Sequence, residues 1–153
     1  MSKTNRFVIR TYGLVINKNN EILISDEFEL GIKMTKFPGG GLEFGEGLID
    51  GLKREFMEEC NGQVIENVQH FYTTDFYQKA LFYDDAQLIS VYFMADLVEP
   101  LCFDISGKAF DFEIGSSKTQ SFRWVKIKDL NEDEITFPID KFVVQKLKQA
   151  MDA

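Results

Sequence analysis

The sequence predicts a mixed α and β fold, either α+β or α/β, in which a sheet carries helices on its faces. Three observations predict it: strand-like runs recur along the chain, one helical period lies near its middle, and a second closes it. The chain has 153 residues, of which 44% are hydrophobic. We therefore expect residues 1–153 to form a single domain with a core of ordinary size.

The first two strands are expected to form a hairpin. Residues 7–17 (FVIRTYGLVIN) are rich in β-branched and aromatic types, and 21–25 (EILIS) repeats that composition after a short polar turn. Residues 28–36 are expected to form a loop. Pro38 and the three glycines at 39–41 then indicate a turn or bulge, where the backbone needs unusual dihedral angles.

The middle helix is expected over residues 47–60. Its apolar residues recur at the spacing of one helical face, at Ile49, Leu52, Phe56 and Cys60. Asn61 and Gly62 end it, because both tolerate the left-handed conformation of a helix C-terminus. The remaining expected elements are strands at about 64–78, 88–98 and 121–127, a long loop over 100–120, and a helix after Pro138.

Charge and composition exclude several classes of partner. The net charge is −8, from 17 basic and 25 acidic residues, so binding to duplex nucleic acid is not expected. No apolar run reaches the ~18 residues of a membrane span, and the N-terminus lacks a secretory signal. Cys60 and Cys102 match no zinc spacing, which favours reduced thiols in a cytoplasmic protein. A divalent metal could supply the positive charge that the chain lacks.

Three glutamates crowd one side of the middle helix. Glu55, Glu58 and Glu59 fall within an arc of about 100°, in the last turn, where like charges repel and the helix dipole disfavours anions. A hard cation such as Mg²⁺ or Mn²⁺ would reverse the sign of that cost. A merely solvated acidic face is the alternative interpretation. The glycine turn weighs against it, because a peptide carbonyl there can approach a ligand closely.

These residues together resemble the signature of the Nudix hydrolases. Gly40 is followed after five residues by Glu46, and seven residues later by the run 54–59 (REFMEE). The flanking residues agree with the family pattern as well. The signature departs at its end, where Asn61 stands in place of glycine and Gly62 in place of an apolar residue.

The resemblance implies a Nudix-type α/β/α sandwich with a central mixed β-sheet flanked by helices. It implies hydrolysis of the diphosphate in a nucleoside diphosphate linked to another group, with Mg²⁺ or Mn²⁺ as cofactor and a small nucleotide as substrate. The metal ligands would be Gly40 through its carbonyl, Glu55, Glu58 and Glu59. Glu55 and Glu58 are the candidates for the catalytic base, and Glu46, Arg54 and Glu43 would support the site.

Some roles stay open at this stage. Many relatives place another acid before the Trp-containing strand; this chain has Gln120 there, with Glu113 and Asp111 as the nearest acids. His70 is interpreted as non-catalytic and Cys60 as a core residue. Lys33 and Lys36 precede the glycine turn and could touch phosphates, but surface lysines are the simpler interpretation.

The substrate is not fixed by the sequence. Tyr77 lies where some dinucleoside-polyphosphate hydrolases of the family carry a tyrosine, and the proline typical of some ADP-ribose hydrolases is absent. Substrate-binding residues stay unknown, and a homodimer stays open. A non-catalytic module that binds a nucleotide metabolite is the second hypothesis, and a purely structural acidic domain the third.

Overall fold

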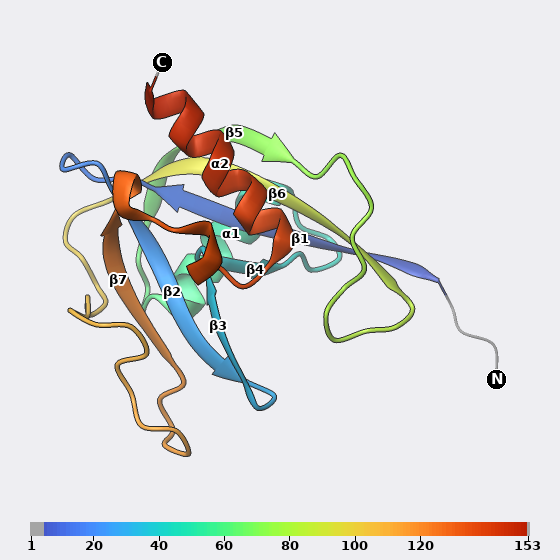
Figure 1. The fold of residues 1–153 in the computed structure, drawn as a ribbon, viewed down its shortest axis with the longest axis horizontal. Coiled ribbons are helices and arrows are strands. Elements are labelled where there is room, and N and C mark those ends of the chain that lie inside the picture. The colour runs from blue at the N-terminus through green and yellow to red at the C-terminus, as the bar shows by residue number, and fades with distance from the viewer. Residues whose placement is uncertain (1–4, 153) are drawn as a thin grey trace.

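The computed structural model describes residues 5–152. Within this range the chain forms seven strands, two α-helices and two short 3₁₀ helices (Figure 1). The strands are β1 (Arg6–Val15), β2 (Glu21–Glu29), β3 (Ile32–Lys36), β4 (Gly39–Gly41), β5 (Ile65–Thr73), β6 (Ala86–Leu97) and β7 (Gln120–Lys126). The helices are α1 (Leu48–Glu59), η1 (Ile127–Asp129), η2 (Glu132–Glu134) and α2 (Pro138–Asp152).

The strands form two sheets instead of the single central sheet that the sequence suggested. The first is mixed and has the order β4-β1-β6-β5, with β1 parallel to β6 and antiparallel to β4. The second is antiparallel and has the order β3-β2-β7. The hairpin expected of the first two strands was wrong, because β1 and β2 lie in different sheets and only an isolated bridge between Ile16 and Ile22 joins the chain across the first turn.

The two α-helices cover opposite faces of these sheets, as Figure 1 shows, with α2 in front and α1 behind. Alternation along the strands separates two cores. On β1, Leu14 faces the core that contains α2, whereas Val15 faces the core that contains α1. Tyr92 and Phe93 divide in the same way on β6. The α/β/α layering expected from the sequence is therefore confirmed.

Helix α1 closely matches its expected range. Leu52, Phe56 and Cys60 are buried, but Ile49 is 39% exposed and does not belong to the core. The helix ends where the sequence predicts, because Asn61 adopts a φ of 52° and Gly62 one of 85°. Asn61 thus takes the left-handed conformation, in place of the glycine of the signature.

Two expected boundaries were wrong. Residues 28–36 form most of a hairpin instead of a loop, since β2 continues to Glu29 and pairs with β3 across a turn at Leu30 and Gly31. Both turn residues have positive φ, at 51° and 77°. Strand β5 stops at Thr73, well before residue 78.

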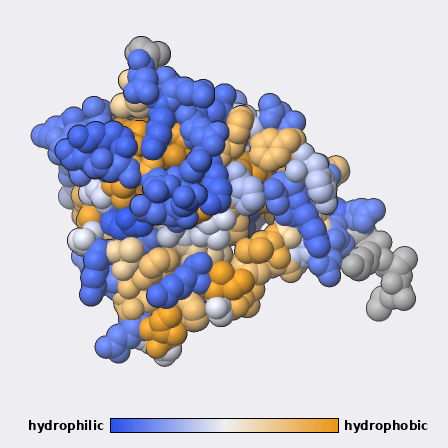
Figure 2. All heavy atoms as spheres, in the orientation of Figure 1, coloured by the Kyte–Doolittle hydropathy of each residue, from blue (hydrophilic) through white to orange (hydrophobic). Residues whose placement is uncertain are grey.

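The surface shows a division of polarity on the face that carries α2. Hydrophilic residues cover α2, and apolar residues gather lower in the view, over the region of the β2–β3 hairpin (Figure 2). The exposed apolar side chains there include Leu30 and Ile32. Among the described residues, no helix has the length and apolarity needed to cross a bilayer.

Candidate active site

Strand β4 is a glycine elbow that brings backbone against side chains of the site. It pairs antiparallel with β1, with Thr11 opposite Gly40. Gly39 has a φ of +145°, and an added Cβ there would lie 2.1 Å from the Thr11 carbonyl oxygen. At Gly40 an added Cβ would lie 2.7 Å from the Glu55 carboxyl atoms. Only glycine lets the Glu55 carboxyl rest against the elbow in this way.

Arg54 connects most of the carboxylates of the acidic face, which is formed by Glu43, Glu46, Glu55, Glu58 and Glu59. Its guanidinium holds Glu46 through two nitrogens, with Nε–Oε2 at 2.9 Å and Nη2–Oε1 at 2.6 Å. Nη2 also donates to the Gly41 carbonyl at 3.0 Å. Nη1 donates to Glu55 at 3.1 Å and to Glu58 at 3.2 Å. One cation thereby ties the loop before α1, the elbow and the helix together.

Glu46 and Glu43 lie in the loop that Arg54 anchors. Hydrogen bonds from Arg54, followed by one from the Glu43 backbone, lower the pKa of Glu46 to about 2. The Glu43 N–H donates to Glu46 Oε1 at 2.9 Å. The Glu43 carboxylate lies 3.5 Å from Arg54 Nη1 and is mostly exposed. Both acids contact Arg54, which is the arrangement expected for supporting residues.

The three helix glutamates differ in environment. Glu55 is buried, Glu59 is partly buried and Glu58 is exposed. Burial, followed by the neighbouring Glu27 and Glu55 charges, raises the pKa of Glu59 to about 7, although Lys36 opposes the rise. The Oε2 atom of Glu59 is buried without a hydrogen-bond partner. A buried, unpaired carboxylate oxygen is costly, so this position suits a cation.

The fit to a metal is good at two of the glutamates and incomplete at the third. Glu55 lies against Gly40, and Glu59, which keeps an unpaired buried oxygen, interacts with the Gly39 backbone and with Glu55, so oxygen donors converge at the elbow. Glu58 instead points its Oε2 at Arg54. Within residues 5–152 no three acidic, histidine or cysteine side chains are close enough to form a metal site as they stand. A cation held here needs a peptide carbonyl or a rotated Glu58 as well.

A cavity of about 500 Å³ lies beside this acidic face. Its lining comes from β1, the β2–β3 hairpin, β6, the segment 78–83 and the start of α2. Glu55 and Glu59 are not part of the lining. The link between cavity and acidic face is made by Arg10, Glu27 and Lys36, which line the cavity and interact electrostatically with the glutamates of α1.

Sequence reasoning missed Glu27 and Arg10 and misjudged Lys36. Lys36 is only 4% exposed, so its interpretation as a surface lysine was wrong. Its Nζ lies 3.2 Å from Glu27 Oε2 and 3.3 Å from the Gly39 carbonyl oxygen. The available signal was a charged residue inside an apolar strand, as in Asp26-Glu27 of β2 and Arg10 of β1.

The position before the Trp-containing strand holds no acid, but an acid faces it. Gln120 lies opposite Glu27 in the β2–β7 ladder and donates to its Oε2 at 3.2 Å. Asp111 pairs with Lys108 at 3.7 Å, and Glu113 is exposed. Neither forms a hydrogen bond or ion pair with the glutamates of α1.

Other residues considered from the sequence lie outside the site. His70 is exposed and bonds to the Thr73 hydroxyl at 2.8 Å. Cys60 is buried, and burial raises the pKa of its thiol. Tyr77 is 70% exposed, and Lys33 lies over the Phe110 ring.

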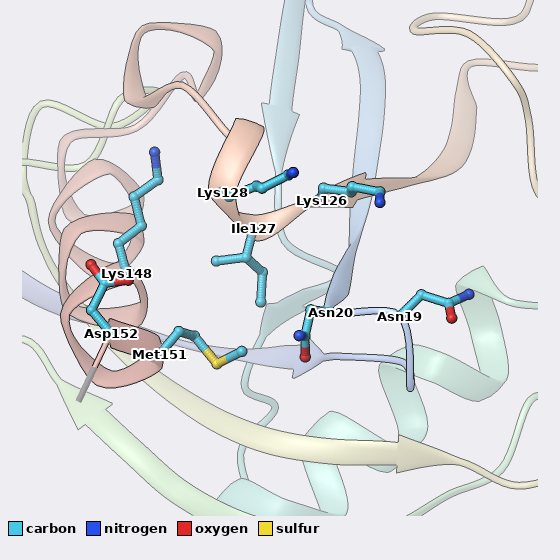
Figure 3. Close-up of a pocket in the computed structure, with 8 residues that line it drawn as sticks. All are labelled: Asn19, Asn20, Lys126, Ile127, Lys128, Lys148, Met151 and Asp152. Carbon is cyan, nitrogen blue, oxygen red and sulfur yellow. The ribbon is translucent and has the colours of Figure 1, made fainter.

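A second hollow of about 450 Å³ lies at the C-terminal end of α2. Figure 3 shows it between η1, the loop at Asn19 and Asn20, and the last turn of the helix, with Lys126, Lys128 and Lys148 around it. It shares no residue with the cavity beside the acidic face. The carboxylates, the elbow and the larger cavity are therefore the candidate active site.

The family model described as the NUDIX domain matches residues 7–145 of the chain. The chain belongs to the Nudix family. As a Nudix hydrolase it is a member of a group that generally uses divalent metal ions and acts on small nucleotide derivatives. No curated protein sequence matches the chain.

Solved structures agree with this assignment at the level of the fold. A NUDIX hydrolase from Nitrosomonas europaea superposes with a TM-score of 0.67 at 16% identity, covering 94% of this chain and 89% of that one. The MutT protein studied from Aliivibrio salmonicida and Vibrio cholerae gives 0.60 at 25%, covering 92% and 95%. MutT from Methanosarcina mazei gives 0.65 at 18%, covering 99% and 100%.

Proposed function

We propose that this Nudix hydrolase cleaves the diphosphate linkage of a nucleoside diphosphate derivative and depends on Mg²⁺ or Mn²⁺. The observation that carries the proposal is the pair of converging carboxylates at the glycine elbow, one of which keeps a buried oxygen without a partner. A divalent ion bound there would neutralise charge on the diphosphate and lower the pKa of a bound water.

Each residue of the acidic face has a proposed role. Glu55, Glu59 and the Gly40 carbonyl hold the ion, and Glu58 joins them when it leaves Arg54. Arg54 and Glu46 position α1 against the elbow through their two-nitrogen contact. Glu55 and Glu58 are the candidates for accepting the proton of the attacking water, with Glu43 in an outer position.

The chemistry asks the protein for positioning and charge stabilisation, without a covalent nucleophile. This agrees with the environments of His70 and Cys60. His70 lies outside the site, and the Cys60 thiol is buried with a raised pKa. The cavity beside the acidic face is large enough for part of a nucleotide.

The test is hydrolysis of a panel of nucleoside diphosphate derivatives with Mg²⁺ or Mn²⁺, with and without EDTA. Activity that requires the metal is expected for the wild-type protein. Glu59→Gln should lose at least ~100-fold in kcat, because it removes a charged ligand from the ion. Glu66→Gln makes the same charge change on exposed β5 and should retain full activity.

Equal activity of Glu59→Gln and wild type would remove Glu59 from the chemistry. No turnover of any panel member, with metal binding retained, would favour the alternative of a non-catalytic module that binds a nucleotide metabolite.

A further inference from the structure

Three basic side chains line the cavity beside the acidic face: Arg10, Lys36 and Lys79. Two of them are ion-paired, Lys36 with Glu27 at 3.2 Å and Lys79 with Asp84 at 3.2 Å. Among residues 5–152, no carboxylate oxygen lies within 4.0 Å of the Arg10 guanidinium. Arg10 therefore differs from the other cations of the cavity in lacking an anionic partner.

The position of Arg10 joins the cavity to the glycine elbow. Arg10 lies opposite Gly41 in the β1–β4 ladder, and its Nη1 lies 4.0 Å from the position that a Cβ on Gly41 would occupy. The side chain is partly buried. Its Nε donates to the Tyr12 hydroxyl at 2.6 Å, the one hydrogen bond recorded for the guanidinium within the described part of the chain. The two terminal nitrogens make no hydrogen bond within residues 5–152.

A guanidinium prefers to engage anions in pairs of parallel hydrogen bonds, and phosphate oxygens match that geometry. A partly buried guanidinium with unused donors is costly, which argues that a ligand completes it. The carboxylates of Glu55, Glu27 and Asp140 interact electrostatically with Arg10 and help to keep it charged without occupying its donors.

We propose that Arg10 is a phosphate-positioning residue, whose terminal nitrogens bind non-bridging oxygens of the substrate phosphate that lies between the glycine elbow and the cavity. This inference rests on the proposed function and assigns one side of its substrate site. Binding there would place the diphosphate next to Glu55 and Glu59 and direct the attached group into the cavity.

The test is the affinity of the purified protein for inorganic pyrophosphate in EDTA, measured by titration calorimetry. Arg10→Gln should weaken pyrophosphate binding at least ~10-fold, because the positive charge and the paired hydrogen-bond donors are both lost. Arg10→Lys should fall between this variant and wild type, since a lysine keeps the charge and loses the paired donors. In hydrolysis, Arg10→Gln should raise KM more than it lowers kcat.

Two further variants provide controls. Arg6→Gln removes an arginine four residues earlier on the same strand, where Arg6 pairs with Asp85 at 3.4 Å, and should bind pyrophosphate as wild type does. Tyr12→Phe removes the hydrogen bond to Nε and keeps the guanidinium, so it should lose far less affinity than Arg10→Gln. Unfolding midpoints of all variants check that each one folds.

Equal losses in Tyr12→Phe and Arg10→Gln would overturn the inference, because Arg10 would then serve only to hold Tyr12. Unchanged pyrophosphate affinity in Arg10→Gln, or no pyrophosphate binding by wild type, would overturn it as well. Failure of the proposed function looks different: no nucleotide is hydrolysed, while the pyrophosphate series still follows Arg10.

Discussion

The Arg54 guanidinium donates hydrogen bonds to the Glu46 carboxylate through Nε and Nη2, at 2.9 and 2.6 Å. Its Nη1 donates to Glu55 and Glu58. A lysine can supply one charge but not this planar set of donors. We expect Arg54→Lys to fold and to lose roughly 10-fold or more in kcat, because α1 is no longer fixed against the elbow. Steady-state kinetics and an unfolding midpoint measure the two effects. An unchanged kcat would show that the contact has no part in positioning the site.

The same contact predicts a dependence of stability on acid pH. The pKa of Glu46 is 4.5 in the unfolded chain and about 2 in the folded protein. Its contribution to the free energy of unfolding is therefore fully present above pH 4.5 and is lost as the pH falls through about 2. The difference in unfolding midpoint between wild type and Glu46→Gln should shrink over that range. Parallel curves for the two proteins would contradict this expectation.

Metal removal should reveal how far the charged Glu59 destabilises the fold. Its pKa is raised from 4.5 to about 7, so the folded state binds the proton more tightly and stability falls as pH rises across that interval. In EDTA at about pH 8, Glu59→Gln should unfold at a higher temperature than wild type, by roughly 2–4 °C per kcal/mol relieved. Adding Mg²⁺ should stabilise wild type more than the variant. An equal response to Mg²⁺ would contradict the assignment of Glu59 as a ligand.

Asp140 provides a second buried acid to test. It accepts a hydrogen bond from the Tyr92 hydroxyl through Oδ1, while Oδ2 is buried without a partner. Burial raises its pKa from 3.8 to about 6, so the charged form destabilises the fold above that value. Asp140→Asn should therefore raise the unfolding midpoint at neutral pH and leave it unchanged near pH 4. Asp129→Asn, at an exposed position of η1, is the matched control. A lower midpoint at neutral pH would contradict the prediction.

Gly40→Ala should separate activity from folding. The added Cβ would meet the Glu55 carboxyl at 2.7 Å, and that flexible end of the side chain can move away. We expect a loss of about 10-fold or more in kcat with a small change in unfolding midpoint, because a ligand is displaced without disturbing the core. Gly107→Ala adds the same methyl group with no heavy atom within 4 Å and should be neutral. Full activity of Gly40→Ala would show that Glu55 tolerates the shift.

Much of the scaffold could be predicted because its signals are local. The period of α1, the left-handed Asn61 and the spacing that brings Glu46 to Arg54 are all set within some twenty residues of chain. The β3 strand was missed because Ile32–Lys36 alternates only weakly, and its pairing with β2 depends on a tight turn at Leu30. Pairing supplied by a neighbour overrides a loop-like composition.

The wall of the site could not be predicted from local pattern. Arg10, Glu27 and Lys36 come from three different strands, and only the register of β1 with β4 and of β2 with β3 brings them beside the elbow. Arg10 stands out in the sequence as a charge within an apolar strand, and Glu27 follows the apolar run of β2, whereas Lys36 ends a segment of loop-like composition. Such a residue indicates an inward charge but does not identify the partner that it meets.

Arg54 serves the acidic face as a built-in counterion. Because this side chain already neutralises part of the glutamate charge, the chain can reach its folded state before any ion arrives from solution. Under the proposed function, metal loading is an exchange, in which an incoming ion takes over oxygens that the arginine releases. Chelators should accordingly abolish hydrolase activity reversibly without denaturing the protein, and refolding from urea should proceed equally well in EDTA.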